Sequence, residues 1–391
     1  MQDNRSLEFF YLHNSLKTLG EVCAGSFFLA YFYKQGFTFL DLALTMAGVF
    51  ALRFTLRKLL LPLMERTDLR NGLIIGTLLF PFRYLAAFPV HTFGAWLFVF
   101  IFSFALAESI YFTYYHAYWV SVMGRTGGAA NFGTREALAQ VVQVLGSVVS
   151  GYLLATHGAL LSFGAGALFA LFSCIPLFAL PKQPPAHKDE RPEPRAESIA
   201  RLRGILIAEG FFSAGMGIMW PIVLFTAADS DFLGFGVLLA IAALLYALGD
   251  YLLGKHFDAI PKHWLAATGA LLMFVDLTGR AIFGVTPEAI IGFNVLASIA
   301  SVAYYMAHSQ MSYGCIRESG YPLKAAWHHE TSWDIGAVAG LLIAAGIIAL
   351  GISPRVTLIM CAFGALGAGW FMFRYYRPAA VLKESAASIT A

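Results

Sequence analysis

The sequence predicts an all-α integral membrane protein with twelve transmembrane helices, arranged as two six-helix halves with both termini in the cytoplasm. The first observation is composition: 59% of the 391 residues are hydrophobic and only 13% are charged, whereas soluble globular chains carry about 25% charged residues. The second is that apolar stretches of about 20 residues, long enough to cross a bilayer, recur about a dozen times. The third is a charged, proline-rich segment that divides these stretches into two equal sets.

Six apolar stretches precede the dividing segment. The first of them lacks the short apolar core and small-residue cleavage site of a signal peptide, so we expect it to be retained as a helix. Together they predict an N-terminal six-helix bundle over residues 1–180. The predicted spans are 7–33, 38–64, 72–91, 94–122, 133–156 and 158–180.

The dividing segment, residues 181–203, contains five prolines and ten charged residues. Such a composition cannot pack a core and is typical of a linker. We therefore expect a cytoplasmic linker, a C-terminal six-helix bundle over 204–378 and a cytoplasmic tail over 379–391. The predicted spans of the second bundle are 204–226, 233–254, 264–284, 288–316, 326–350 and 354–376.

The lysines and arginines of the short loops predict the orientation. Alternate loops on one side are rich in these residues, while the other side offers little beyond Lys34 and Arg355. Because cytoplasmic loops carry the excess of positive charge, the rich side is cytoplasmic, together with the linker and both termini. We expect a multi-pass protein of the cell inner (plasma) membrane, in contact with the lipid bilayer and monomeric.

Several classes of function are disfavoured by the sequence. A net charge of +3 without a basic stripe argues against nucleic-acid binding. The four cysteines lie inside apolar stretches with no close-spaced pair, so neither a disulfide framework nor a zinc site is indicated. There is no Walker-type ATP-binding loop and no arrangement of nucleophile and base. We expect no enzyme activity, no cofactor and no bound metal.

The two predicted halves resemble one another. The fourth span contains Tyr114-Tyr115-His116-Ala117 and the tenth contains Tyr304-Tyr305-Met306-Ala307-His308. The fifth span opens with Arg135-Glu136 and the eleventh with His329-Glu330. A parallel repeat of six helices is typical of transporters built from two halves.

The loop after the eighth span reads Gly254-Lys255-His256-Phe257-Asp258 and is followed by basic residues. This resembles the loop signature of the major facilitator superfamily, which has glycine, three residues, aspartate and then basic residues. In the first half Leu61 replaces the glycine and Glu65 the aspartate, while the acid and base are kept. The resemblance implies a cytoplasmic latch between the halves, formed by Glu65, Arg66, Lys255 and Asp258.

Ionisable residues within the predicted spans are the candidate mechanistic groups, because each costs at least about 2.5 kcal/mol at membrane depth unless it is paired or hydrated. Glu21, Arg53 and Glu108 fall within about 5 Å of one another in height. Burial favours the protonated carboxyl and a nearby arginine favours the carboxylate. We expect Glu21 and Glu108 to couple transport to protons. A permanent salt bridge that fixes helix packing is the structural alternative.

We expect a cytoplasmic gate near the inner ends of the spans, made of ion pairs that form when the inner mouth closes. Simple charge complements at helix N-termini are the alternative. The expected gate residues are Glu65, Arg66, His116, Arg135, Glu136, Asp258, His308, His329, Glu330 and Asp334.

Aromatic and basic residues of the central helices are the candidate substrate contacts. They predict a small, partly apolar organic solute, carried by a proton-coupled secondary transporter. One alternative is a copper transporter using Met216, Met219, Met306, His308 and Met311, since thioether and imidazole ligands suit a soft ion. Another is a receptor of the same fold that does not transport. The expected substrate-binding residues are Lys17, Arg53, Tyr111, Tyr115, Trp220, Tyr304 and Trp333.

Overall fold

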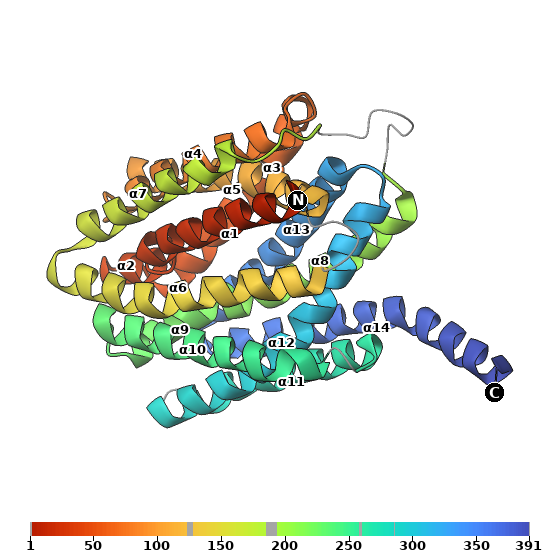
Figure 1. Cartoon of the computed structure of the whole chain (residues 1–391). Helices are drawn as coiled ribbons and strands as arrows, with labels where there is room; N and C mark the ends of the chain where they lie inside the picture. Colours follow the sequence, from red (N-terminus) through yellow and green to blue (C-terminus); the bar gives the residue numbers. More distant parts are fainter. Residues whose placement is uncertain (1, 123–127, 185–193, 258–259, 285, 391) are drawn as a thin grey trace.

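A computed structural model describes residues 2–122, 128–184, 194–257, 260–284 and 286–390. Within these ranges the only regular secondary structure is helical. The helices lie side by side as an elongated bundle, with most of the red to yellow helices of the first half above most of the green to blue helices of the second (Figure 1).

The first half begins with a helix that a short π-helical segment divides. Two later helices start at side-chain caps: Thr38 forms a capping box with Asp41, and Asp68 accepts a hydrogen bond from the backbone N–H of Asn71. The elements are α1 (Gln2–Gly20), η1 (Glu21–Gly25), α2 (Phe28–Lys34), α3 (Phe39–Met64), α4 (Leu69–Ala87), α5 (Ala95–Val122), α6 (Gly128–Thr156) and α7 (Ala159–Phe178).

The second half starts earlier than predicted, because residues 196–203 of the expected linker are helical. Ile199 and Leu202 are buried there, and Arg201 pairs with Glu197 one turn away. The sequence analysis missed this short amphipathic pattern because the surrounding segment is charged and rich in proline. The elements are α8 (Ala196–Ser213), η2 (Ala214–Met219), α9 (Trp220–Ala227), α10 (Phe232–Phe257), α11 (Lys262–Phe283), α12 (Pro287–Glu318), α13 (Pro322–Ala349) and α14 (Val356–Thr390).

Ten helical stretches in the described part of the chain are long and apolar enough to cross a membrane. The prediction from hydropathy was twelve. The remaining two candidates are the broken helix α1–η1–α2 and the 19-residue helix α4. These two carry Lys17, Glu21 and Arg83, three charges that lower their hydropathy and that the structure pairs with one another.

The two halves repeat one close helix contact. A Cβ atom on Gly76 of α4 would lie 2.6 Å from the Cα of Tyr111 on α5, and one on Gly269 of α11 would lie 2.6 Å from the backbone N of Tyr304 on α12. Only glycine allows these backbones to approach so closely. Tyr111 and Tyr304 therefore occupy corresponding buried places, each against the third long helix of its own half.

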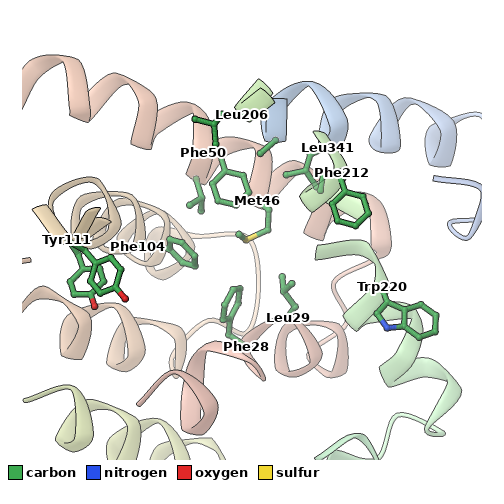
Figure 2. Packing of buried hydrophobic residues seen from close by; sticks show 14 of the residues in the cluster. Phe28, Leu29, Met46, Phe50, Phe104, Tyr111, Leu206, Phe212, Trp220 and Leu341 are labelled. Atoms are coloured by element: carbon green, nitrogen blue, oxygen red, sulfur yellow. The ribbon is translucent and has the colours of Figure 1, made fainter. Parts of the chain in front are cut away.

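The halves meet mainly where α3 packs against α13 and α6 against α10, and α5 also contacts α13. Met46 and Phe50 of α3 lie in the same apolar layer as Leu206 and Leu341 of the second half (Figure 2). We call the end of the bundle where α3 meets α4 the linker end, because the backbone N–H of Leu69 donates there to the linker carbonyl of Gln183. This interface carries the charged residues that form the candidate site.

Candidate functional site

Arg53 links the two halves at the centre of the molecule. It lies on α3 and its side chain is 4% exposed. One nitrogen of its guanidinium pairs with Glu108 of α5, in the same half, and its Nε donates to Oδ1 of Asp334 on α13 at 2.6 Å. The rings of Phe50 and Trp333 lie together against the guanidinium, with centroids 4.6 and 4.9 Å from its Cζ and 5.2 Å from each other.

Arg57 repeats this link one turn further toward the linker end. Its side chain is fully buried and pairs with both Asp334 and Glu330 of α13, the latter at 2.5 Å. Its Nη1 also donates to the backbone carbonyl of Glu330 at 3.2 Å. Asp334 is thus fully buried between two arginines of the other half.

Arg83 of α4 continues the network within the first half. Its two terminal nitrogens donate to Glu108 and to Glu21, each at 2.9 Å. Tyr84 also donates to Glu21, at 2.7 Å, and Lys17 Nζ lies 3.9 Å from the same carboxylate. The connected groups balance four acids against four bases. They are Glu21, Glu108, Glu330 and Asp334 with Lys17, Arg53, Arg57 and Arg83.

The structure therefore brings Glu21, Arg53 and Glu108 into one network, as their common depth suggested. It adds Arg57 and Arg83, which the sequence analysis did not single out. Both are arginines inside predicted spans, and the cost of an unpaired charge at membrane depth was a signal that could have found them. Asp334 was predicted as a gate residue near the inner ends of the spans. In the structure it lies deeper, where it pairs with Arg53 and Arg57.

Three histidine–glutamate contacts lie beside this network on the wall of the central cavity. His116 Nε2 of α5 is 3.0 Å from Oε1 of Glu330, and His329 Nδ1 is 3.2 Å from the same oxygen. In the second half, His308 Nε2 of α12 lies 2.6 Å from Oε2 of Glu209 on α8. The sequence analysis did not single out Glu209 either, although it is a charged residue inside the predicted span 204–226.

The remaining predicted gate residues are divided between the halves. Arg135 pairs with its neighbour Glu136 and donates to the hydroxyl of Tyr115 at 2.8 Å within the first half, and it also hydrogen-bonds Tyr313 of the second half. Glu65 accepts a hydrogen bond from the hydroxyl of Tyr321 at 3.0 Å, which joins the halves at the linker end. Arg66 is exposed, and Asp258 lies outside the described residues.

A cavity of about 930 Å³ lies between the halves. Its wall includes helices α3, α5 and α6 of the first half and α8, α10, α12 and α13 of the second. The predicted site residues in its lining are Arg53, Glu108, His116, Arg135, Glu136, His308, His329, Glu330 and Trp333.

Five predicted substrate contacts are not part of this lining. Trp220 covers the guanidinium of Arg280, 4.5 Å from its Cζ, and the hydroxyl of Tyr111 lies 3.0 Å from Nε2 of His13. Lys17, Tyr115 and Tyr304 contact neighbouring helices in the same way. Aromatic residues on the central helices were expected to face the solute, whereas these pack the helices of each half together.

The fold and the site define a class: a polytopic helical membrane protein whose two halves enclose a central cavity with a buried charge network, which is the architecture of a solute transporter. A family model described as the major facilitator superfamily matches residues 15–315. The chain belongs to that superfamily.

Solved structures agree with this assignment. A POT family transporter in complex with 5-aminolevulinic acid is 10% identical, with a TM-score of 0.66 and coverage of 96% of each chain. A variant of the E. coli fucose:proton symporter FucP is 14% identical, with a TM-score of 0.65 over 96% of this chain and 98% of that one. A variant of the peptide transporter POT is 13% identical, with a TM-score of 0.64 over 94% and 93%. No curated protein matches the sequence significantly.

Proposed function

We propose that the chain is a proton-coupled secondary active transporter that moves a small, partly apolar organic solute by alternating access. In this proposal α1–η1–α2 and α4 also cross the membrane, giving twelve spans in bundles 1–180 and 204–378. The linker, the tail and both termini are cytoplasmic. The protein works as a monomer in the inner (plasma) membrane.

The central observation behind the proposal is that Arg53 and Arg57 of the first half hold Asp334 and Glu330 of the second. Alternating access requires contacts whose free energy differs between the two states. When α3 and α13 separate at this level, these buried charges lose their partners. A solute or a proton that replaces the lost partner then determines which state is favoured.

The ends of the bundle support separate gates. At the linker end Tyr321 donates to Glu65 across the halves. At the opposite end Lys34 donates to the carbonyl of Ser230 across the halves, at 2.9 Å. Opening one end breaks one contact and leaves the other intact. The proposed cytoplasmic gate comprises Glu65, Arg66, His116, Arg135, Glu136, Asp258, His308, His329, Glu330 and Asp334.

Arg83 supports the coupling role of Glu21 and Glu108. The two carboxylates share its guanidinium. When one of them is protonated, Arg83 therefore pairs with the charge of the other alone. Glu108 also pairs with Arg53, which in turn holds Asp334 across the halves. Protonation of Glu108 removes one of the two negative charges that hold Arg53 in place, and so weakens the Arg53–Asp334 pair between the halves. This links protonation to the movement of the halves.

The cavity supports an organic solute. Its volume falls at the upper end of the range of about 300 to 1,000 Å³ that is usual for small-molecule sites. Phe50, Phe112, Tyr305 and Trp333 offer apolar surface, and Arg53 offers a cation for an acidic group of the solute. Lys17, Tyr111, Tyr115, Trp220 and Tyr304, which were also predicted as substrate contacts, support the helices behind this wall.

A thermal-shift screen of the purified protein against a solute library tests the proposal first. We expect an organic compound to raise the melting temperature of the wild type but not of Arg53→Met. Uptake of that compound into proteoliposomes is then measured with and without a proton gradient. Uptake that is equally concentrative after the gradient is collapsed would overturn the coupling, and a screen in which no organic solute binds would overturn the substrate class.

Copper(I) transport is the second candidate, because Met216, Met306 and His308 all line the cavity. Thioether and imidazole ligands suit this soft ion. Including copper(I) in the same screen separates the two candidates: a shift that is lost in Met306→Leu favours the metal.

A further inference from the structure

Three metal-ligating atoms from the two halves converge on the cavity wall. They belong to His116 on α5 and to His329 and Glu330 on α13, whose ligand atoms lie within 4.8 Å of one another. Oε1 of Glu330 contacts both Nε2 of His116 and Nδ1 of His329. All three residues line the cavity, so one side of the group faces open space. His116 is partly buried and the other two are buried.

We propose that His116, His329 and Glu330 bind a divalent transition-metal ion, best matched by zinc, which bridges the two halves. This site goes beyond solute transport and is not the copper candidate, whose thioether ligands are absent from it. Two imidazoles and a carboxylate with a fourth position open to the cavity are a ligand set typical of zinc.

The distances suit this ion after a small adjustment. Bonds of about 2.0 Å in a tetrahedron place the ligand atoms about 3.3 Å apart. The carboxylate oxygen is already 3.0 Å from His116 Nε2 and 3.2 Å from His329 Nδ1. The two imidazole nitrogens lie within 4.8 Å of each other, so they must approach by at most about 1.5 Å to complete this geometry.

The surrounding groups hold the ligands in a binding orientation. The hydroxyl of Tyr313 lies 3.1 Å from Nδ1 of His116, which leaves Nε2 to face the site. Arg57 holds the other oxygen of Glu330, so Oε1 is the one left for the metal. Such supporting hydrogen bonds orient the ligands of metal sites.

Metal binding requires neutral imidazoles. The adjacent ion-pair network pairs its four acids with Lys17, Arg53, Arg57 and Arg83, without a contribution from either histidine to the balance of four acids and four bases. An ion at this site joins α5 to α13, so it opposes the separation of these helices.

Zinc titration of the full-length protein without a polyhistidine tag, monitored by calorimetry in detergent, tests the site. We expect one zinc ion per chain and no response to Mg²⁺, which prefers oxygen ligands. His116→Ala and His329→Ala should each weaken zinc binding about tenfold or more, and Tyr313→Phe by about 10- to 100-fold. Co²⁺ should give the visible absorption of a tetrahedral site.

His328→Ala is the matched control, because His328 is the neighbouring residue on α13 and its ring lies near Arg203 instead. It should bind zinc as the wild type does. If an alanine variant does not elute as a single species, His329→Gln preserves a polar side chain without a ligand nitrogen. Unchanged zinc affinity in the folded His116 and His329 variants, or no binding by the wild type, would overturn the site whatever the outcome of the solute screen.

Discussion

Arg57 is the most deeply buried basic residue of the charge network, with both of its acidic partners on the opposite half. We expect Arg57→Met to reduce the free energy of unfolding by about 3 to 5 kcal/mol, because Asp334 and Glu330 would keep buried charges with weaker compensation. Thermal unfolding in detergent measures this change.

Lys58→Met is the control for this prediction, since Lys58 is the next residue of α3 and is exposed. It should change the melting temperature little, as expected of surface substitutions. Equal melting temperatures for Arg57→Met and Lys58→Met would show that the inter-half pairs do not stabilise the protein.

Glu108 is the residue for which we predict a change in the pH dependence of uptake. Glu108→Gln keeps the shape of the side chain but removes the negative charge that Arg53 and Arg83 share. We expect solute uptake by this variant to lose its dependence on external pH and to become non-concentrative. Glu288→Gln, an exposed change at the start of α12, should behave as the wild type. A normal pH profile in Glu108→Gln would remove Glu108 from the coupling mechanism.

At this scale the sequence was a good guide to which residues need partners and a poor guide to which partners they have. The energetic cost of a membrane-buried charge singled out Glu21, Arg53 and Glu108. In the structure Arg83 joins Glu21 to Glu108, and Glu108 pairs directly with Arg53. That Asp334 would receive two arginines depends on how the halves pack. No local pattern in the sequence contains this information.

Among the elements, α6 of the first half and α10 of the second pack with their backbones close together. A Cβ atom on Gly236 of α10 would lie 2.4 Å from the backbone carbonyl oxygen of Ser147 on α6. Gly236→Ala must push the two helices apart, because the backbone atoms of α6 cannot move aside as a flexible side chain can. We expect a loss of about 1 to 3 kcal/mol in the free energy of unfolding, measured by thermal unfolding.

Gly164→Ala on α7 provides the comparison, since a Cβ atom there meets nothing within 4 Å. Alanine has the higher helix propensity, so this variant should be as stable as the wild type or slightly more stable. A Gly236→Ala protein as stable as Gly164→Ala would mean that the two helices are not tightly packed in solution.

The helices themselves were largely predictable, because apolar length is a strong signal in a membrane protein. Predicted boundaries such as 38–64 and 94–122 agree closely with α3 and α5. The early start of α8 was not predictable from composition, which is averaged over the whole linker. Nor was the break of the first helix at η1, since a wide turn leaves no mark in hydropathy.

At the scale of the whole molecule, one buried apolar core runs through both halves, and the linker is the stretch of chain that connects them. We expect residues 1–184 and 194–391, expressed together as separate chains, to assemble and purify as a complex. The ion pairs of Arg53 and Arg57 should hold this complex together, so a first half with both arginines changed to methionine should purify alone. Failure of the unmodified halves to associate would contradict this prediction.

The π-helical segments η1 and η2 each interrupt the first helix of a half near its middle. A π turn holds one more residue than the α turn that it replaces. The extra residue shifts the part of the helix that follows it around the helix axis, so the segments before and after each break present different faces to the neighbouring helices. Glu21 begins the wide turn of the first half and Ala214 that of the second, so of the two turns only the first places a carboxylate at the break.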